Sequence, residues 1–490
     1  MFKKPKISVW WATIIFFFIF PVLVLIVGLC ERQISRYRID SHIEKLKEQG
    51  YPISIAEVKL KNNKIKAENN KVKDLIAAIK LIIEWETKSI PEDRRKDYYP
   101  ISTAQANSTR MGMPMGMGMG MPTRISAPLP EKYRTKIPED WEEKNDATLV
   151  ICGASEIKDE LNKYQMKAAK DYLSDNAKAL KQIEKILYRQ DKYQNLSYIN
   201  ESDIYENLWK ADELIGLYGI VMGQEGQYIE AVKAVEMKFL LANTLNGATN
   251  IYIISEGNEM RNTAVRLANQ LFKICDFNKE HLDKLGKIIN EGYDNIQGYQ
   301  QGLIAEQARI IDEKDDILST SNLFEDDFFE LSTLREIDYK FEGKYEDFYN
   351  ALLILEKKIK IAGMDYPENI KETKLLGKSK IISKYPYRYS SGFFNEYPEH
   401  CRRYETILSL GKMTVTIEKY KLKYNKLPTE SENLVGEFIE KIPVDQYDGK
   451  KLKYIQLSEG KGYIIYSVGD NQRDDGGKRG YDILIHDFYN

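Results

Sequence analysis

The sequence predicts a mainly α-helical protein that has an N-terminal transmembrane helix and a small α+β domain at its C-terminus. Three observations support this fold class: a long apolar run near the start, helical periodicity through the middle, and alternating strand-like segments near the end. We expect a helical bundle or irregular helical solenoid, followed by a long helix packed on a three-stranded antiparallel sheet.

The overall composition is that of a folded protein. Of its 490 residues, 43% are apolar and 30% are charged. The 72 Lys and Arg residues nearly balance the 74 Asp and Glu residues. Because the chain lacks the excess of positive charge that attracts a phosphate backbone, composition gives no support to nucleic-acid binding.

The apolar run has the length of a membrane span. No charged residue occurs from Ile7 to Cys30, and a helix of that length crosses the hydrocarbon layer. We therefore expect a transmembrane anchor over residues 9–30, with Trp10 and Trp11 at one interface. A cleaved signal peptide or a lipidated Cys30 is the alternative, although no small-x-small cleavage site ends the apolar run.

Charges on the two sides of the anchor predict its orientation. Lys3, Lys4 and Lys6 precede it, which favours a cytoplasmic tip over residues 1–8 and an extracytoplasmic bulk, in the inner (cytoplasmic) membrane. The basic residues after the anchor weaken this assignment; they are Arg32, Arg36 and Arg38.

Changes in composition divide the rest of the chain into four predicted parts. They are juxtamembrane helices over 31–99, broken at 49–54; a Met/Gly/Pro-rich flexible linker over 100–130; a helical domain over 131–403; and a C-terminal domain over 404–490. Inside the helical domain, apolar residues at three- and four-residue steps predict an antiparallel hairpin of helices over 205–222 and 228–242, joined by a turn at 223–226.

The linker contains an unusual methionine pattern. Methionine occupies every second position from Met111 to Met121, and Gly or Pro fills the positions between. Thioethers bind copper(I), so a copper-handling role is one interpretation. A flexible low-complexity loop is the other, because Gly and Pro at half the positions oppose regular structure.

Two further segments have side chains suited to carbohydrate chemistry. An acidic stretch could supply the carboxylate pair of a glycosidase; its acids are Glu325, Asp326, Asp327 and Glu330. An aromatic, turn-forming loop over 385–399 could stack on a sugar or a partner protein. Both segments are equally consistent with a solvated acidic face and with rings packed on their own domain, and we expect no enzyme.

Cysteine and histidine do not indicate a site. Cys152, Cys275 and Cys401 lie far apart without metal-ligand spacing, so we expect buried free thiols. The histidines are scattered without partners at ligand spacing; they are His42, His281, His400 and His486.

The C-terminal domain begins with a helical stripe from Tyr404 that we expect to end at Pro428. A second short helix is expected over 430–440. Three strands follow: one carries Leu452 and Tyr454 on one face, the next runs from Tyr463 to Val468, and the last is YDILIHDF.

These segments contain three ordered motifs. YKLKYNKLPTESENLV, IPVDQYDGKKLKY and YIIYSVGDNQRDDGG, followed by YDI, resemble the C-terminal domain of the major pseudopilin of type II secretion systems. The whole layout resembles a group of membrane-anchored proteins found in planctomycete-type bacteria. That second resemblance implies an architecture and no settled activity.

The pseudopilin resemblance implies a calcium-binding loop. The positions that match are Asn471, Asp474, Asp475 and Asp482. Calcium prefers such oxygen ligands, but Asn471 replaces the usual first aspartate, and the nearby basic residues weaken the field; they are Arg473, Lys478 and Arg479. A metal-free hairpin loop is the alternative.

The departures from pseudopilins are at the N-terminus. The chain lacks the leader glycine and the glutamate of the filament-forming helix, and about 375 residues separate the apolar run from the C-terminal domain. An ordinary pseudopilus subunit is therefore not expected. The sequence predicts a single-pass extracytoplasmic structural or interaction protein, with the membrane and an envelope protein as partners and with no small-molecule substrate identified.

Overall fold

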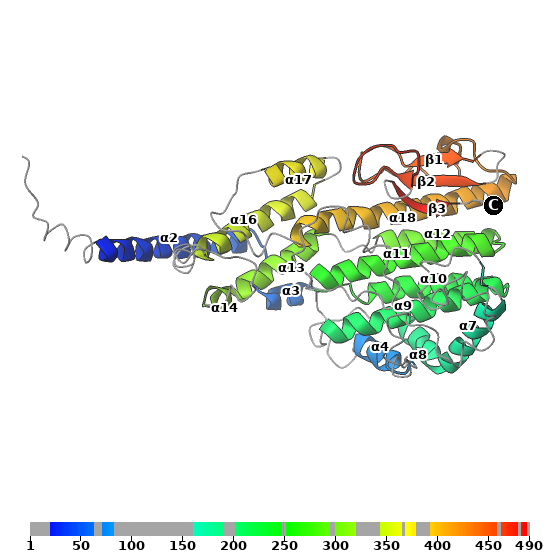
Figure 1. Cartoon of the computed structure of the whole chain (residues 1–490), viewed down its shortest axis with the longest axis horizontal. Coiled ribbons are helices and arrows are strands. Elements are labelled where there is room, and N and C mark those ends of the chain that lie inside the picture. Colours follow the sequence, from blue (N-terminus) through cyan, green and yellow to red (C-terminus); the bar gives the residue numbers. More distant parts are fainter. Residues whose placement is uncertain are drawn as a thin grey trace, which may run out of the picture. The chain divides into compact units, whose positions relative to one another are not determined.

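The computed structural model describes most of the helical residues and the C-terminal sheet (Figure 1). The described residues are 20–62, 71–82, 160–161, 163–189, 201–246, 248, 251–294, 299–319, 344–364, 368–378, 393–457, 462–478 and 482–487. The chain forms two compact units. Unit 1 comprises 1–61, 303–364 and 368–396, and unit 2 comprises 62–302, 365–367 and 397–490.

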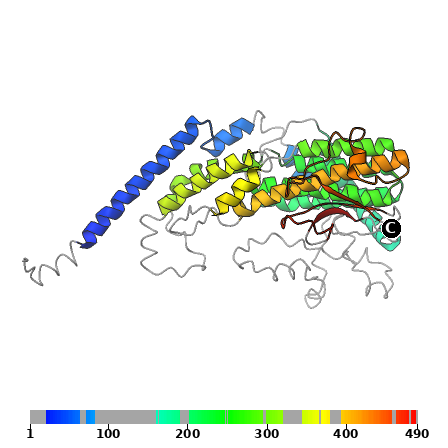
Figure 2. The ribbon, with the colours of Figure 1, turned by 90° about the horizontal axis from the view of Figure 1, so that it is seen from above.

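Unit 1 is entirely helical in its described part. Its helices are α2 (Phe20–Glu48), α3 (Ile55–Asn62), α13 (Tyr299–Asp312), α14 (Lys314–Ser319), α16 (Lys344–Ala362) and α17 (Glu368–Lys378). Figure 2 shows α2 as one uninterrupted helix. It ends where Gly50 adopts a φ of +80°, so the break expected over 49–54 is confirmed.

The core of unit 1 forms where α2 packs on α16. The buried residues of α2 recur every three or four positions, which places them on one face; they are Ser35, Ile39, His42, Ile43 and Leu46. The facing residues of α16 include Tyr345, Phe348, Leu352, Leu355 and Ile359. This regular spacing explains how two short stretches, far apart in the chain, form one apolar interface.

Among the residues that the structure describes, no helix has both the length and the apolar character needed to cross a membrane. The first part of the expected anchor, residues 9–19, lies outside the described residues.

Unit 2 combines a helical layer with the C-terminal sheet. Its helices are α4 (Lys71–Ile79), α7 (Lys163–Asp175), α8 (Ala177–Leu187), α9 (Glu201–Gln224), α10 (Tyr228–Asn243), α11 (Ile251–Ile274), α12 (Lys279–Asp294) and α18 (Phe393–Tyr424). A 3₁₀ turn, η9 (Ser431–Leu434), precedes β1 (Lys453–Gln456), β2 (Tyr463–Ser467) and β3 (Ile483–Asp487).

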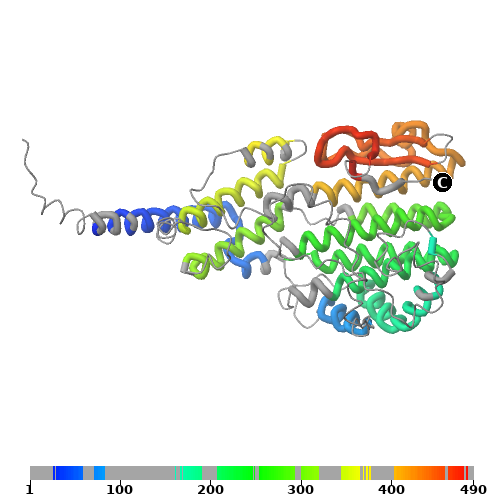
Figure 3. The backbone as a smooth tube through the Cα atoms, in the orientation of Figure 1, coloured from blue at the N-terminus to red at the C-terminus, as the bar shows by residue number. Residues whose placement is uncertain are grey.

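The predicted helical hairpin is confirmed in α9 and α10, which lie against each other along their length (Figure 3). Gly226 has a φ of +76° in the turn between them, a conformation that side chains rarely adopt. On α9, a Cβ at Gly219 would lie only 2.9 Å from the Cβ of Ala234, so glycine allows the close approach of the two helices.

A buried ion pair lies in the same helical layer. Lys238 Nζ of α10 lies 2.7 Å from Asp212 Oδ2 of α9, and both side chains are almost fully buried. Thr263 of α11 donates its hydroxyl to the same carboxylate, at 3.0 Å from Oδ1. Three helices thereby satisfy one another's buried polar groups, which a buried charge requires.

Helix α18 begins earlier than the sequence indicated. Residues 393–399 were expected in a turn-forming loop, but they form its first turns. Pro398 is the sixth residue of the helix, so its missing N–H removes one hydrogen bond between residues four positions apart. The helix ends at Tyr424 because Asn425 adopts the left-handed conformation (φ 51°), three residues before Pro428.

Helix α18 packs on α11 and α12. A Cβ at Gly411 would lie 2.7 Å from Val265 Cγ1, and Lys419 Nζ forms an ion pair with Asp283 at 2.7 Å. Ser255 and Tyr404 share a hydrogen bond of 3.2 Å between their hydroxyls. The C-terminal module, defined here as residues 404–490, thus joins the helical layer of unit 2 through its own long helix.

The short helix expected over 430–440 is wrong for most of its length. Only η9 is helical, because Gly436 adopts a φ of +90° and Val435 instead bridges Ile439. Asn433 closes this turn by accepting hydrogen bonds at Oδ1 from the N–H groups of Thr429 and Glu430, at 3.1 Å each.

The sheet has the order β1-β2-β3, and both pairings are antiparallel. Tyr454 opposes Ile465 in the first pairing, and Ile465 opposes His486 in the second. Figure 1 draws the sheet beside α18, and Tyr463 of β2 donates its hydroxyl to Glu418 Oε1 of that helix at 2.9 Å. A mainly helical chain with a small antiparallel sheet near its C-terminus is confirmed.

Candidate functional site

The candidate site is the loop over 468–478 that follows β2. Every residue of β2 is buried, whereas Asp470 to Gly476 are exposed. Gly469, Gly476 and Gly477 all have positive φ, between 63° and 75°. A Cβ at Gly477 would lie 3.1 Å from Ile464 Cγ2, so the paired glycines let this loop return closely over β2.

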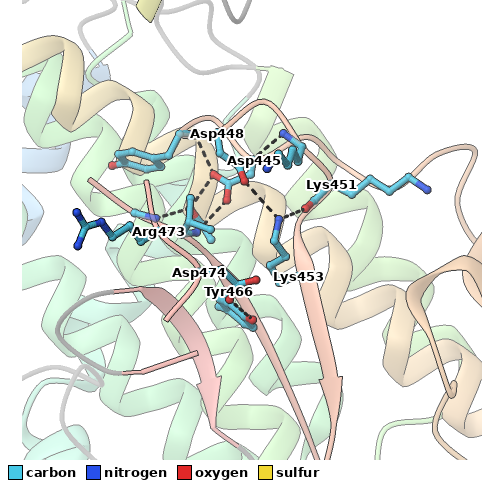
Figure 4. A network of polar contacts seen from close by, with 12 residues as sticks. Asp445, Asp448, Lys451, Lys453, Tyr466, Arg473 and Asp474 are labelled. Carbon is cyan, nitrogen blue, oxygen red and sulfur yellow. Dashed lines mark hydrogen bonds and ion pairs between the residues drawn. The ribbon is translucent and has the colours of Figure 1, made fainter. Parts of the chain in front are cut away.

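A fully buried aspartate fixes the start of this loop (Figure 4). Asp445 accepts at Oδ1 from Ser467 Oγ (2.7 Å) and from the Tyr447 N–H (2.9 Å), and at Oδ2 from the Val468 N–H (2.9 Å). Burial raises the pKa of Asp445, and these hydrogen bonds oppose that rise. The aspartate therefore joins the turn before β1 to the end of β2.

Asp474 is held on the outer side of the sheet. Its Oδ1 accepts from the Tyr466 hydroxyl at 2.7 Å and from the Gly476 N–H at 3.1 Å. The hydrogen bond from Tyr466 lowers the pKa of Asp474, whereas burial and this carboxylate raise the pKa of Tyr466. Figure 4 shows the Asp474 carboxylate directed at the ring hydroxyl.

Asn471 and Asp475 contact each other. Asn471 donates from Nδ2 to Asp475 Oδ2 at 2.7 Å and accepts at Oδ1 from the Arg473 N–H at 2.8 Å. Its amide oxygen therefore closes a local turn. Both side chains are exposed.

Asp482 is the only buried member of the four predicted ligands, with 6% of its surface exposed. Its Oδ2 accepts from the N–H groups of Gly477 (2.8 Å) and Lys478 (3.0 Å). Its Oδ1 is buried and receives no hydrogen bond from the described residues. A carboxylate oxygen in that state favours a bound cation or water.

Three of the four predicted ligands therefore lie on the loop over 468–478 and Asp482 lies directly before β3, and the four do not form a closed set. Within the part of the chain that the structure describes, no three His, Cys, Asp or Glu side chains converge as a metal site would need. Asn471 Oδ1, Asp474 Oδ1 and Asp475 Oδ2 already accept hydrogen bonds, and of the four residues only Asp482 presents a buried oxygen without a hydrogen bond from the described residues. Calcium binding would require these side chains to turn toward Asp482, and Asn471 would have to exchange the Arg473 N–H for the ion.

Several other predicted sites lie outside the described residues. They are the methionines from Met111 to Met121, the acids Glu325, Asp326, Asp327 and Glu330, the loop residues 385–392, and Cys152. Cys275 is a free, buried thiol, as expected, and burial raises its pKa to about 12. That environment suits a structural cysteine and opposes nucleophilic chemistry.

Two groups of polar residues were not predicted from the sequence. Asp445 lies inside the motif IPVDQYDG, and the position of an acid before a Tyr-Asp-Gly turn was the available signal. His42 of α2 lies with Nε2 at 3.3 Å from Glu356 Oε2 of α16. No pattern links these residues, because only tertiary packing brings α2 and α16 together.

Comparison of the chain with models of protein families, with curated proteins and with solved structures gives no match.

Proposed function

We propose that this chain is a single-pass, membrane-anchored, extracytoplasmic structural or interaction protein that works beside a type II secretion or filament-like envelope system. Its N-terminus is cytoplasmic, residues 9–30 cross the inner membrane, and both units stand outside the cytoplasm. The pseudopilin-like motifs support the association, and the charge-free run from Ile7 to Cys30 supports the anchor.

One observation carries the anchoring proposal. Helix α2 begins at Phe20, inside the apolar run, and continues without a break to Glu48. From Ser35 onward its buried face packs on α16. A helix that is apolar at one end and part of a folded core at the other connects a membrane to a domain without a flexible linker.

Membrane extraction and fusion reporters test this proposal. Membranes from cells expressing the full chain are washed with alkaline carbonate, and we expect the protein to stay in the pellet. A chain lacking residues 1–30 serves as the control and should be released. Alkaline phosphatase fused after Asn490 should be active, because that enzyme matures only outside the cytoplasm. Carbonate release of the full chain would contradict the anchor.

The C-terminal module supplies the interaction surface in this proposal. Four large apolar side chains are exposed on it, each by 41% to 48%; they are Leu422, Tyr424, Val435 and Val444. Exposed apolar side chains contribute binding energy when a partner covers them.

A photo-crosslinking residue at Val444 tests for the partner in native membranes. The matched control carries the same residue at Lys178, an exposed position on α8. We expect the Val444 variant to capture pilin-like or secretion-channel proteins that the control does not. Capture of the same proteins from both positions, or of none, would contradict a specific interaction through the module.

Calcium binding by the loop is a second candidate function, and the free buried Oδ1 of Asp482 favours it. Extracellular calcium modules have dissociation constants of about 0.1 to 1 mM. At about 10 mM calcium, binding of that strength stabilises the folded state by about 1.4 to 2.7 kcal/mol.

Thermal melts in calcium and in chelator measure this effect. We expect calcium to raise the melting temperature of the wild type by a few degrees. The variants Asp482→Asn and Asp474→Ala should not show this rise. Glu440→Gln, an exposed change in the same module, is the control and should keep the full shift. If the wild type melts at the same temperature in calcium and in chelator, the loop does not bind calcium and the second candidate function is wrong.

A further inference from the structure

Three cations surround one buried aromatic ring in unit 1. Tyr345, the second residue of α16, is fully buried. The guanidinium carbons of Arg32 and Arg36 lie 5.3 and 5.4 Å from its ring centroid, and Lys344 Nζ lies 5.6 Å from it. Arg32 Nε also donates to the Tyr345 hydroxyl at 2.9 Å. We call these four residues the basic cluster.

No acid among the described residues forms an ion pair with this cluster. Neither Arg32 nor Arg36 forms an ion pair with an acid among the described residues. Lys344 Nζ donates to the neutral carbonyl oxygen of Leu318. The geometry keeps any two of the three charges within roughly 11 Å, about the Debye length at 0.1 M salt, so they repel one another. Cation–π attraction offsets part of this repulsion.

The acids nearest in sequence do not change this conclusion. One residue step turns an α-helix by about 100°, so Glu31 lies on a different side of α2 from Arg32. Asp40 already pairs with Lys314 at 2.7 Å. Glu346 and Asp347 lie in the first turn of α16, where acids complement the positive end of the helix dipole, and among the described residues no ion pair joins either of them to the cluster.

The position of the cluster along α2 indicates what neutralises it. If the hydrocarbon layer ends near Cys30, then Arg32 and Arg36 lie about 3 and 9 Å beyond it at 1.5 Å per residue. The headgroup region is about 5 to 8 Å deep on each side of a bilayer. The backbone of Arg32 therefore lies at headgroup depth, and that of Arg36 lies at the outer edge, from which a long side chain reaches back to the phosphates. Ile34 and Tyr37, at about 6 and 10.5 Å on the same scale, are 51% and 75% exposed, as expected for side chains at or just beyond an interface.

We propose that the basic cluster binds the headgroup phosphate of an anionic phospholipid in the leaflet next to unit 1. This inference rests on the anchor proposed above and adds a lipid specificity to it. Arg36 is exposed and Arg32 is partly exposed, so both can reach a phosphate while Tyr345 holds their side chains in place. Two guanidinium groups suit phosphate because each presents paired N–H donors.

Native mass spectrometry of the full chain tests the lipid specificity. The protein in detergent micelles is supplied with equal amounts of dioleoyl phosphatidylglycerol and dioleoyl phosphatidylcholine, and the retained lipids are counted. We expect the wild type to retain phosphatidylglycerol over phosphatidylcholine by at least about fivefold. The triple variant Arg32→Gln/Arg36→Gln/Lys344→Gln should retain the two lipids equally.

Matched controls separate charge from folding. The variant Lys47→Gln/Lys357→Gln/Lys371→Gln removes three exposed lysines from the same unit and should keep the wild-type preference. Arg36→Gln alone tests one exposed side chain, so it applies even where the triple variant unfolds, and it should reduce the preference.

Flotation with phosphatidylcholine vesicles distinguishes the two proposals. If the protein floats but retains the two lipids equally, the anchor stands and the headgroup site is wrong. If the wild type does not float, the anchor itself is wrong and the lipid site falls with it. An unchanged preference in both the triple variant and Arg36→Gln would also overturn the lipid site.

Discussion

Ser467 donates its hydroxyl to Asp445 Oδ1 across 2.7 Å, and this hydrogen bond joins residues 22 positions apart in the C-terminal module. Asp445 is fully buried, so its carboxylate depends on protein donors. Two backbone N–H groups, from Tyr447 and Val468, supply the remaining hydrogen bonds. The shape of the loop after β2 therefore depends on one acid outside that loop.

Asp445→Asn should lower the free energy of unfolding by about 1 to 3 kcal/mol, because the amide NH₂ would face a donor and leave buried groups unsatisfied. Urea unfolding followed by circular dichroism measures the change. Glu440→Gln, an exposed substitution nearby, is the control and should stay within about 0.5 kcal/mol of the wild type. Equal stabilities of both variants would show that Asp445 does not join the two segments.

Gly219→Ala should destabilise unit 2, although alanine favours a helix by about 1 kcal/mol over glycine. The new Cβ would lie 2.9 Å from Ala234 Cβ and 3.1 Å from Leu267 Cδ2, so α9, α10 and α11 would have to separate. We expect a net loss of about 1 to 3 kcal/mol in urea unfolding. Ile229→Ala, at a residue 65% exposed on α10, is the matched control. A more stable Gly219→Ala protein would contradict the close packing.

Glu405 on α18 should make stability fall as pH rises. Burial raises its pKa from 4.5 to about 7, against an opposing effect of the Arg402 charge. The unfolded chain loses this proton near pH 4.5 and the folded chain only near pH 7, so the folded state binds more protons between these values. The stability that the buried neutral acid allows is fully present below about pH 4.5 and is lost towards pH 7.

We expect a loss of about 1 to 3 kcal/mol over this range, measured as the difference between the wild type and Glu405→Gln in urea unfolding at several pH values. The variant lacks the titrating group, so it should exceed the wild type in stability at pH 8 and approach it at pH 4.5. Parallel curves for the two proteins would show that Glu405 titrates normally.

Cys275 should resist thiol reagents in the folded protein. Its side chain is buried, its pKa is raised to about 12, and the thiolate is the reactive form. In a Cys30→Ser/Cys152→Ser/Cys401→Ser background, we expect the labelling rate to follow the unfolded fraction as urea is added. In the same background, Cys275→Ser/Lys178→Cys places the one thiol at an exposed position on α8 and should label at once without urea. Rapid labelling of Cys275 in buffer would show that the site opens locally.

The hairpin of α9 and α10 and the order of elements in the C-terminal module could be predicted because they depend on local patterns. Apolar residues at three- and four-residue steps define a helical face. Gly226 signals a turn that does not depend on the position of the following helix. The helix expected over 430–440 failed for a related reason, since the apolar spacing did not reveal the left-handed Gly436 that stops it.

The candidate loop shows where such patterns are insufficient. Asn471, Asp474, Asp475 and Asp482 lie close together in the sequence, but whether their oxygens meet depends on side-chain partners such as Tyr466 of β2. The acid before the Tyr-Asp-Gly turn marks Asp445 in the sequence, but no sequence pattern connects it to the loop after β2.

By itself the sequence determined the helical class of the chain, the apolar run before Cys30 and the position of the C-terminal sheet, because each depends on residues near one another in the chain. Only the tertiary structure decided which side chain Arg32 and Arg36 contact. In the sequence, these positive charges after the apolar run weaken the prediction of a cytoplasmic N-terminus. In the structure, both guanidinium groups lie over the ring of Tyr345, a residue more than 300 positions away. Such a contact forms when two helical faces pack, and no local pattern encodes which faces will meet.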